Sequence, residues 1–420
     1  MLDIKFIREN KDLVASGAKK KNVDFNIDAL LEADDKRRAL MGKIEEMRAA
    51  QNSASQTIVN ATALEKEEIL KKMTALKADM EKEEAELKEV MREWQSLMLQ
   101  VPNVPDISVP EGEGDVQNKE IKKWGELPKF SFQPKSHIEI MTKLNMVDLE
   151  RGTKVSGFRG YFLKNDGALL SYAIWQYALN FFLGKGFTPM IVPSLVRREA
   201  LLGTGFLPQG EEDLYKTQDG DFLAGTGEVA TMGYYMDEIL PKESLPTKFL
   251  SFSPCFRREA GSHAKDVKGL IRVHEFYKLE QVILCVAEHD ESVKFHEELN
   301  RNTEEFIESL GIPYHTVVNC GGDLGLGQVK KYDIELWVPL ENKYREISSA
   351  SYFHDFQTRR LNIRYKDEDG KTRYVHSLNS TAIPTPRLLV SLVENFQQED
   401  GSVRIPEALQ PYMGGRKVIK

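Results

Sequence analysis

Charged residues alternate around Phe276 in the stretch from Cys255 to Leu284. Alternate residues of a strand share a face, so Arg257 and Glu259 are predicted to point the same way. On the returning strand the same rule groups Arg272, His274, Phe276, Lys278 and Glu280. Guanidinium groups bind phosphate in a bidentate fork, and a phenyl ring stacks on a base. This face therefore suits a nucleotide, and a solvated, salt-bridged hairpin face explains this stretch equally well. The cation-rich connection GSHAKDVKGL (261–270) is longer than a tight turn, so we expect it to close over a ligand.

A second stretch, HSLNSTAIPTPRLLVSLVENFQ (376–397), ends in a predicted amphipathic helix. The apolar side of this helix carries Leu388, Leu389, Leu392, Val393 and Phe396. Thr385 suits the N-cap, and Pro386 suits the first helical position, where a missing N–H costs nothing. Arg387 follows in the first turn, where a cation is unfavourable beside the positive end of the helix dipole. An anion bound there would explain Arg387, and an ion pair with a nearby acid is the alternative.

The region before residue 103 is predicted to be helical. No glycine occurs between Gly42 and Gly112, and the first proline is Pro102, which favours long helices. Apolar residues recur every seven positions in two series, which are Met73, Met80, Leu87 and Trp94, and Ile69, Leu76, Val90 and Leu97 with Glu83 as an interruption. A looser pattern of the same period runs from residue 30 to residue 58. These seams predict an antiparallel coiled-coil arm of ~50 Å with its turn near residues 58–64. A dimerising coiled coil is the alternative.

The composition changes at residues 101–118, VPNVPDISVPEGEGDVQN, which are rich in proline and glycine and are typical of a linker. Beyond it, strand-like runs such as KFLSFSPCFR alternate with helical patterns such as YAIWQYALNFFLGKG. This order predicts an α+β domain built on an antiparallel sheet. We therefore expect an N-terminal domain with the arm at 1–103, a linker at 104–118 and a catalytic domain at 119–420.

Composition excludes several classes of protein. No apolar run approaches the ~20 residues of a membrane span, and the first residues resemble neither a signal peptide nor a transit peptide. The cysteines Cys255, Cys285 and Cys320 have no paired spacing, which disfavours a disulfide framework and a zinc knuckle. We expect a cytoplasmic protein without a membrane partner. The net charge of −8 argues against indiscriminate nucleic-acid binding, so any such contact must be local.

Three motifs in order resemble those of the class II aminoacyl-tRNA synthetases, in the form found in the seryl-tRNA synthetase family. FRREAGSHAKDVKGLIRVHEFYKLE (256–280) is similar to the second motif, and LNSTA with PRLLVSLVENFQ is similar to the third. KGFTPMIVPSLV (185–196), with Pro193, resembles the first motif, which builds the dimer interface in that family. The arm matches the N-terminal arm of the family in position and length. The resemblance therefore covers essentially the whole chain, and it implies a class II fold and a homodimer.

The resemblance implies ATP-binding roles for specific residues. Arg257 would hold the α-phosphate, Phe276 would stack on adenine and Arg387 would hold the γ-phosphate. Glu346 in EISSAS would bind Mg²⁺ through ATP, and Arg257, Arg387 and Glu346 would be the catalytic residues. The implied ATP-binding set is Arg257, Arg258, Glu259, Arg272, Val273, Phe276, Glu346, Ile347, Ser348, Ser349 and Arg387.

The resemblance also implies a binding site for L-serine. Thr226, Gly227 and Glu228 match the loop that closes over the amino group. Glu280, Asn379 and Thr381 match the pocket around the hydroxyl and carboxylate groups. The sequence departs from the family at Gly227, where serine or alanine is usual, at Glu275, where glutamine is usual, at LNST, and at Pro384 and Pro386. Glycine would leave the amino-acid loop more flexible.

The implied reaction has two steps. Serine and ATP would give seryl-adenylate and pyrophosphate, and the seryl group would then pass to the 3′-terminal ribose of tRNA(Ser), with tRNA(Sec) as a further candidate. The arm would recognise the transfer RNA by shape and backbone contacts. A relative that loads a carrier protein is one alternative, although such relatives lack the arm. A non-catalytic RNA-binding adaptor is another, although Arg257, Glu346 and Arg387 are all present.

Overall fold

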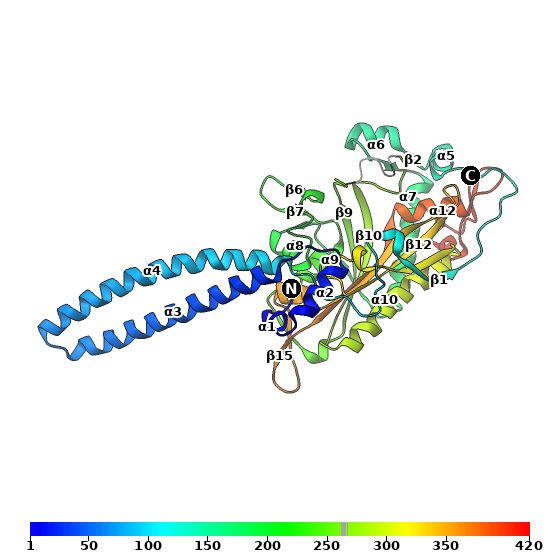
Figure 1. Cartoon of the computed structure of the whole chain (residues 1–420). Coiled ribbons are helices and arrows are strands. Elements are labelled where there is room, and N and C mark those ends of the chain that lie inside the picture. Colours follow the sequence, from blue (N-terminus) through cyan, green and yellow to red (C-terminus); the bar gives the residue numbers. More distant parts are fainter. Residues whose placement is uncertain (262–265, 267) are drawn as a thin grey trace. The chain divides into compact units, whose positions relative to one another are not determined.

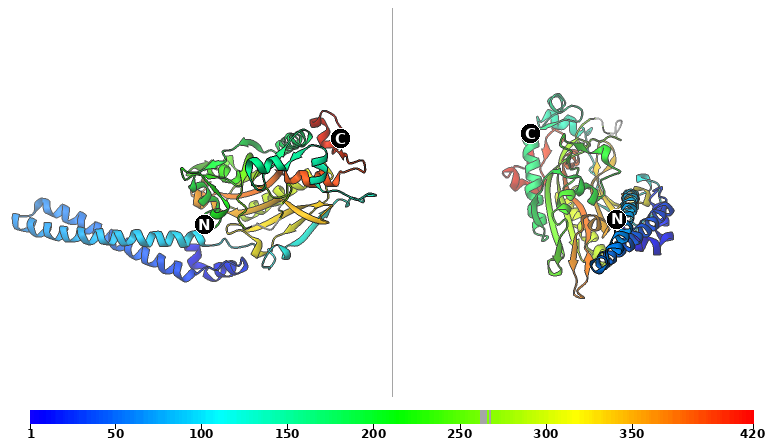
Figure 2. Two further views of the ribbon diagram at one scale, coloured as in Figure 1. Left: turned by 90° about the horizontal axis from the view of Figure 1, so that it is seen from above. Right: turned by 90° about the vertical axis from the view of Figure 1, so that its left-hand side faces the viewer.

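The computed structural model describes residues 1–261, 266 and 268–420. It contains two compact units, one formed by residues 1–19 and 23–102 and the other by residues 20–22 and 103–420. The first unit is built of helices, and the second holds the strands of the described residues (Figures 1 and 2).

The first unit is dominated by two long helices. The short helices α1 (Ile4–Glu9) and α2 (Lys11–Lys20) come before α3 (Ile27–Asn60) and α4 (Ala63–Gln100). α3 and α4 lie side by side, and only two residues join them, so they run in opposite directions (Figures 1 and 2). Those two residues fall inside the predicted turn at 58–64. At the turn, the backbone N–H and the hydroxyl of Thr62 both donate to Glu65, which fixes the start of α4.

The seam between α3 and α4 follows the predicted heptads. The buried positions of the predicted heptads are Leu30, Ala33, Leu40 and Ile44 on α3 and Val90 on α4. The other heptad positions of α4 are half-buried, including Glu83. The carboxylate of Glu83 accepts a hydrogen bond from Lys43 Nζ at 2.5 Å across the seam, which explains how an acid is tolerated there. The predicted antiparallel coiled-coil arm is confirmed.

The second unit is built on one eight-stranded sheet in the order β1-β11-β12-β13-β16-β10-β9-β4. Its strands are β1 (Lys119–Trp124), β4 (Thr188–Ile191), β9 (Thr247–Phe256), β10 (Glu275–Cys285), β11 (Tyr314–Val318), β12 (Lys330–Val338), β13 (Lys343–His354) and β16 (His376–Thr385). Neighbouring strands are antiparallel except β4 and β9, which are parallel. The predicted α+β fold on an antiparallel sheet is confirmed. β9 and β10 form the predicted hairpin, with Phe276 opposite Cys255 and Glu280 opposite Ser251. The predicted strands were too long, because Arg257 and Glu259 lie beyond the end of β9, and Arg272 and His274 lie before the start of β10.

Three helices cover one face of this sheet and share its main hydrophobic core. They are α7 (Asp166–Leu183), α10 (His289–Leu310) and α12 (Arg387–Asn395). Leu279 and Ile283 of β10 belong to this core, together with Phe182 of α7 and Phe306 of α10, whose rings stack. Because side chains alternate along a strand, Lys278 and Glu280 point to the opposite face of the sheet.

The start of α12 differs from the prediction by one position. Thr385 is the last residue of β16, and Pro386 occupies the N-cap position. The hydroxyl of Thr385 accepts a hydrogen bond from Trp175 Nε1 at 2.9 Å instead of capping the helix. Arg387 is the first helical residue, in the first turn as predicted.

Shorter elements complete the second unit. The helices are α5 (His137–Lys143), α6 (Leu149–Ser156), α8 (Arg198–Thr204), α9 (Gly227–Gly233) and α11 (Phe356–Leu361). The small sheets contain β2 (Val147–Asp148) with β3 (Phe162–Leu163), β5 (Leu195–Val196) and β6 (Tyr215–Lys216) with β7 (Phe222–Leu223), β8 (Ile239–Pro241) and β15 (Thr372–Tyr374) with β14 (Arg364–Lys366), and β17 (Val403–Arg404) with β18 (Val418–Ile419). Among the described residues, no helix combines the length and the apolar character that crossing a bilayer requires. The predicted boundaries at 103–104 and 118–119 stay predictions.

Candidate active site

Two adjoining cavities contain most of the predicted site residues. A small one, of about 60 Å³, is lined by Arg257, Glu259, Arg272, Val273, Phe276, Ile347 and Arg387, among others. A larger one, of about 260 Å³, is lined by Thr226, Glu228, Glu280, Ser349, Asn379 and Thr381, among others. Arg257, Lys278, Glu346 and Thr381 line both cavities. The first is called the nucleotide-side cavity here and the second the serine-side cavity, after the predicted roles of their residues.

On the nucleotide side, two arginines approach from different elements. Arg257 follows β9, and its guanidinium carbon lies 5.3 Å from the centre of the Phe276 ring. Its Nε donates to the carbonyl of Gly225 at 3.3 Å. Arg387 of α12 donates to the carbonyls of Ile271 at 2.9 Å and Glu346 at 2.7 Å. Arg257 and Arg387 therefore meet around one cavity, although 130 positions separate them in the chain.

Among the described residues, neither of these arginines has an acidic partner. Within residues 1–261, 266 and 268–420, no carboxylate lies within 4.0 Å of the guanidinium nitrogens of Arg257 or Arg387. Burial lowers the pKa of Arg387, with the neighbouring charge of Glu346 acting in the opposite direction. By contrast, Arg272 is paired with Glu259 and lies 3.9 Å from Asp266. The described residues therefore do not form the ion pair with a nearby acid that was the alternative explanation for Arg387.

On the serine side, a network of buried polar groups is already closed. Lys278 forms an ion pair with Glu280 and donates to Thr226 Oγ1 at 2.8 Å and Thr381 Oγ1 at 3.4 Å. The hydroxyl of Thr381 donates to Glu280 at 3.4 Å. Lys278 is the partner that the solvated-hairpin explanation would give to Glu280, but the pair lies inside the cavity and not at an exposed edge.

Glu228 is positioned by the start of α9. The hydroxyl of Thr226 accepts from the N–H of Glu228 at 3.3 Å, which caps the helix and places Glu228 in its first turn. The carboxylate accepts a hydrogen bond from Gln357 Nε2 at 2.6 Å. Burial, followed by the charge of Glu280, raises the pKa of Glu228 to about 7. A cation bound beside Glu228 would favour its ionised form.

Glu346 is an exposed carboxylate between the two cavities. It lies on β13, three residues before Ser349, which lines the serine-side cavity. Asp333 lies opposite Ser349 on β12, and burial raises the pKa of Asp333 to about 7. Among the described residues, no cluster of three or more histidine, cysteine, aspartate or glutamate side chains has the arrangement of a metal site.

Several predicted residues lie outside the two cavities. Arg258 is exposed, and Gly227 and Ser348 are buried but line neither cavity. The hydroxyl of Ser348 donates to the carbonyl of Thr381 at 2.5 Å, so it supports a lining residue from behind. The connection 261–270, predicted to close over a ligand, includes residues 262–265 and 267, which lie outside the described part of the chain. Sequence reasoning missed Gln357 and residues 325–328, which carry no recognisable local motif.

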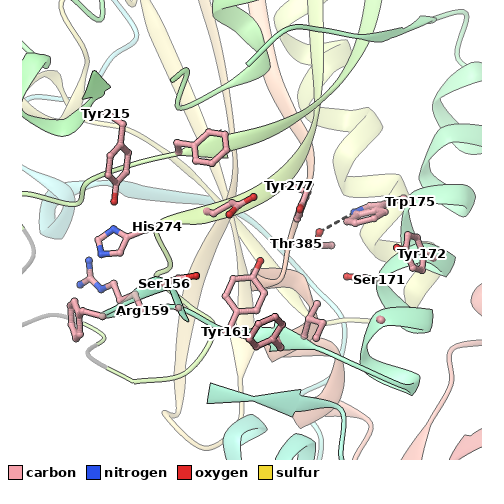
Figure 3. A pocket seen from close by; sticks show the side chains of 17 residues that line it. Ser156, Arg159, Tyr161, Ser171, Tyr172, Trp175, Tyr215, His274, Tyr277 and Thr385 are labelled. Atoms are coloured by element: carbon pink, nitrogen blue, oxygen red, sulfur yellow. Dashed lines mark hydrogen bonds between the residues drawn. The ribbon is translucent and has the colours of Figure 1, made fainter. Parts of the chain in front are cut away.

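A third and larger cavity, of about 460 Å³, lies elsewhere (Figure 3). It is lined mainly by aromatic side chains, including Tyr161, Tyr172, Trp175, Tyr215 and Tyr277. Tyr277 is the strand neighbour of Phe276 and Lys278, so it points to the other face of β10. None of the predicted site residues lines this cavity. Size alone would therefore have selected the wrong place.

Comparison with known proteins agrees with this arrangement. Residues 1–105 match the family of the seryl-tRNA synthetase N-terminal domain, and residues 215–396 match the tRNA synthetase class II core domain (G, H, P, S and T). The chain is 46% identical over 420 residues to the serine–tRNA ligase of Deinococcus radiodurans, covering 100% of this chain and 99% of that protein. It is 42% identical to the serine–tRNA ligase of Treponema denticola, with 99% of each chain covered.

Solved structures show the same similarity. The seryl-tRNA synthetase of Pyrococcus horikoshii complexed with ATP matches with a TM-score of 0.91 at 37% identity, covering 100% of this chain and 99% of that one. The cytoplasmic serine–tRNA ligase of Naegleria fowleri in complex with AMP matches with a TM-score of 0.88 at 33% identity and the same coverage. The expected class II fold is therefore confirmed. The chain belongs to the seryl-tRNA synthetase family.

Proposed function

We propose that this chain activates L-serine with ATP and transfers the seryl group to the 3′-terminal ribose of tRNA(Ser). One observation carries the proposal. A cavity with two arginines that have no acidic partner in the described part of the chain adjoins a cavity with a closed polar network, and four residues line both. Full-length similarity to serine–tRNA ligases supports it. The N-terminal domain match counts against a relative that loads a carrier protein.

The nucleotide would bind across the first cavity. Adenine would stack on Phe276, Arg257 would hold the α-phosphate and Arg387 the γ-phosphate. Since no described carboxylate pairs with Arg257 or Arg387, the two cations can bind phosphate oxygens without first breaking such an ion pair. They would stabilise the charge that develops as the serine carboxylate attacks the α-phosphate. Glu259 would contact ATP and keep Arg272 in place, since the two are already paired.

Serine would bind in the second cavity. Its ammonium group would lie against Glu228, and its hydroxyl would join the network of Glu280, Lys278 and Thr381. Asn379 and Thr226 complete the polar lining. A network of this kind favours serine over alanine, because the serine hydroxyl can add a hydrogen bond to it that alanine cannot make.

We also propose Mg²⁺ as the cofactor that accompanies ATP. The donor set fits a hard cation, because Glu346 offers an exposed carboxylate and Ser349 a hydroxyl at the same edge of the cavities. Magnesium usually keeps several water molecules and binds through one or two carboxylates and substrate phosphates, so a three-residue cluster is not required. When bound, the ion would neutralise phosphate charge. Glu346 and Ser349 would hold it, and the backbone carbonyl of Glu346 would keep Arg387 beside it.

The partners proposed are tRNA(Ser), bound by the α3–α4 arm, and a second copy of the chain. Support for a homodimer comes from large apolar side chains that are exposed on and near the first motif, with Ile191 88%, Leu195 51% and Tyr172 59% accessible. The aromatic cavity of Figure 3 borders the same region through α7. A cytoplasmic location is supported by Cys255, Cys285 and Cys320, which are all free thiols. Charging of tRNA(Sec) stays a prediction.

The test is an ATP–pyrophosphate exchange assay across the twenty amino acids. Serine should support exchange strongly, and threonine, alanine and cysteine should support it weakly. Exchange with a different amino acid, or with none, would contradict the proposal. Charging of purified tRNA(Ser) then tests the second step.

A further inference from the structure

Residues 325–328 form a turn that lines the serine-side cavity beside Glu228, Glu280 and Asn379. The N–H of Gln328 donates to the carbonyl of Gly325 at 3.1 Å, which closes the turn. The same four residues are absent from the lining of the nucleotide-side cavity. The turn therefore borders the serine-side cavity and not the nucleotide-side cavity.

The backbone carbonyls of this turn are held by donors from far away in the sequence. Lys21 Nζ donates to the carbonyls of Gly325 at 3.0 Å, Leu326 at 2.9 Å and Gln328 at 2.5 Å. Asn103 supplies the rest, with its N–H donating to the carbonyl of Leu326 at 2.9 Å and its Nδ2 to the carbonyl of Gly327 at 3.0 Å. Every carbonyl of the turn thus accepts a hydrogen bond from Lys21 or Asn103.

The surroundings of Lys21 are unusual for a lysine. Its side chain is buried, with 3% of the residue accessible, and within the described part of the chain its ammonium group has no carboxylate within 4.0 Å. Burial lowers the pKa of Lys21. Three carbonyl oxygens around Nζ act against this, because only the charged ammonium form has three N–H donors to offer them. Burying a charge costs free energy unless hydrogen bonds compensate for it, and the hydrogen bonds of Lys21 all go to this one turn.

The opposite side of the turn has no spare room. A Cβ atom on Gly327 would come within 2.7 Å of the Phe356 ring and 3.3 Å of the Phe353 ring. Gln328 Nε2 donates to Ser351 Oγ at 2.8 Å, and Ser351 lines the serine-side cavity as well. The turn is therefore held between two phenylalanine rings and the donors of Lys21 and Asn103.

Lys21 and Asn103 also have a special place in the chain. Residues 20–22 and the chain from 103 onward belong to the second unit, whereas residues 23–102 between them belong to the first. We propose that Lys21 and Asn103 are positioning residues for serine binding, in that the two segments leading into and out of the helical arm together hold turn 325–328 against the serine-side cavity. This inference rests on the proposed function, since it names the cavity as the place where serine binds.

The experiment uses the full chain and measures exchange kinetics for serine and for ATP separately. Lys21→Met removes the ammonium group and keeps the aliphatic length, and Asn103→Leu removes the amide at the other segment. Each should raise the KM for serine roughly tenfold, because a hydrogen bond from a charged donor or to a buried group is worth about that factor in an equilibrium. The KM for ATP should stay within about twofold in the same variants. Lys19→Met, at an exposed position two residues away, is the matched control and should leave both values unchanged.

The double variant Lys21→Met/Asn103→Leu separates positioning from general loss of stability. If both residues act through one turn, the combined effect on the KM for serine should be smaller than the product of the single effects. Amide hydrogen exchange of the segment 324–330 gives a readout without activity, and it should be faster in each single variant than in Lys19→Met. Should Lys21→Met fail to fold, Asn103→Leu carries both measurements.

An unchanged KM for serine in both single variants, or equal rises in the KM values for serine and ATP, would overturn the inference. Unchanged hydrogen exchange at 324–330 would overturn it too. Failure of the proposed function has a different signature, because the unmodified protein would then show no serine-dependent exchange, and the hydrogen-exchange result alone would decide whether the two residues hold the turn.

Discussion

The guanidinium groups of Arg257 and Arg387 on the nucleotide side have no carboxylate within 4.0 Å among the described residues, whereas on the serine side Lys278 is already paired with Glu280. An open cation attracts any anion of suitable shape and can follow its charge as a reaction proceeds. A closed network instead imposes a cost on a ligand that fails to replace its hydrogen bonds. The contrast indicates that the nucleotide side supplies rate and the serine side supplies selectivity.

Removing either arginine of the nucleotide-side cavity should have the largest effect on activity. Arg257→Ala or Arg387→Ala should lower serine-dependent pyrophosphate exchange by on the order of 100-fold or more, since each removes a group that stabilises the developing charge. Steady-state exchange and circular dichroism check the activity and the fold. Arg404→Ala is the matched control, because Arg404 is exposed, lines neither cavity and belongs to no predicted binding set, and its exchange should stay within about twofold. Near-normal exchange in both Arg257→Ala and Arg387→Ala would refute the nucleotide assignment.

Disrupting the polar network of the serine-side cavity should change the selectivity for serine more than the rate. Glu280→Gln keeps the shape of the side chain and removes its charge, and we expect the KM for serine to rise by about 10- to 100-fold, the range for hydrogen bonds to charged groups. The KM for ATP should change much less, and the preference for serine over alanine should narrow. Exchange kinetics with serine, alanine and threonine measure all three quantities. If serine kinetics and discrimination are both unchanged, the Lys278–Glu280 pair has a structural role only.

The pKa of Glu228 offers a way to sharpen the contrast by pH. The ionised carboxylate would hold the serine ammonium group, so kcat/KM for serine should fall by up to about tenfold for each pH unit below about 7. Glu228→Gln should remove this dependence while lowering the activity at pH 8. A wild-type profile that stays flat between pH 5.5 and 7.5 would show that Glu228 does not contact the ammonium group.

The raised pKa of Glu228 also predicts a change in stability with pH, opposite in direction to the change in activity. Burial raises the pKa of Glu228 from 4.5 to about 7, so the folded protein favours the neutral form. Its contribution to stability is present below pH 4.5 and is lost as the pH rises through 7. Glu228→Gln should therefore raise the free energy of unfolding at pH 8, by on the order of 3 kcal/mol at most, and should change it little at pH 4. Thermal unfolding at the two pH values compares the variant with the wild type.

The smallest effect is expected at Gly227, the departure from the family pattern. A Cβ atom there would lie 3.1 Å from Ser253 Oγ and 3.4 Å from Ser251 Cβ, a tight contact that rotation of the Ser253 hydroxyl can relieve. Gly227→Ala should stabilise the protein by about 0.4–1 kcal/mol, because alanine restricts the unfolded chain and favours the helix that begins here. Chemical denaturation measures this gain. A loss of stability would mean that Ser253 cannot move.

The arm and the charged hairpin face were predictable because each follows a local period. The heptads of α4 need only the sequence between residues 69 and 97, and the grouping of Phe276 with Glu280 needs only strand alternation. Strand alternation does not account for Arg257 and Glu259, because both lie beyond the end of β9. That the two arginines meet in one cavity followed from the resemblance to a family. Strand pairing that brings β10 beside β16 is what places Glu280 near Thr381.

Other parts of the site could not be predicted in this way. Gln357 reaches Glu228 across 129 positions, and Lys21 reaches the carbonyl of Gln328 across 307 positions. Backbone carbonyls are present at every residue, so a turn held through them leaves no pattern of side-chain types to recognise. The one-position error at the start of α12 has a similar origin, since the hydroxyl of Thr385 is used by Trp175, a distant residue.

The hydrogen bonds of Lys21 and Asn103 set a limit on building chimeric enzymes. Exchanging the first 103 residues for those of a relative would remove Lys21 and Asn103 together with the arm. Turn 325–328 would then depend on the residues that the relative has at these two positions. A graft limited to residues 23–102 would exchange the helical hairpin and keep the native donors with the turn they hold. The choice of junction would thus determine whether exchanging the arm also changes the KM for serine.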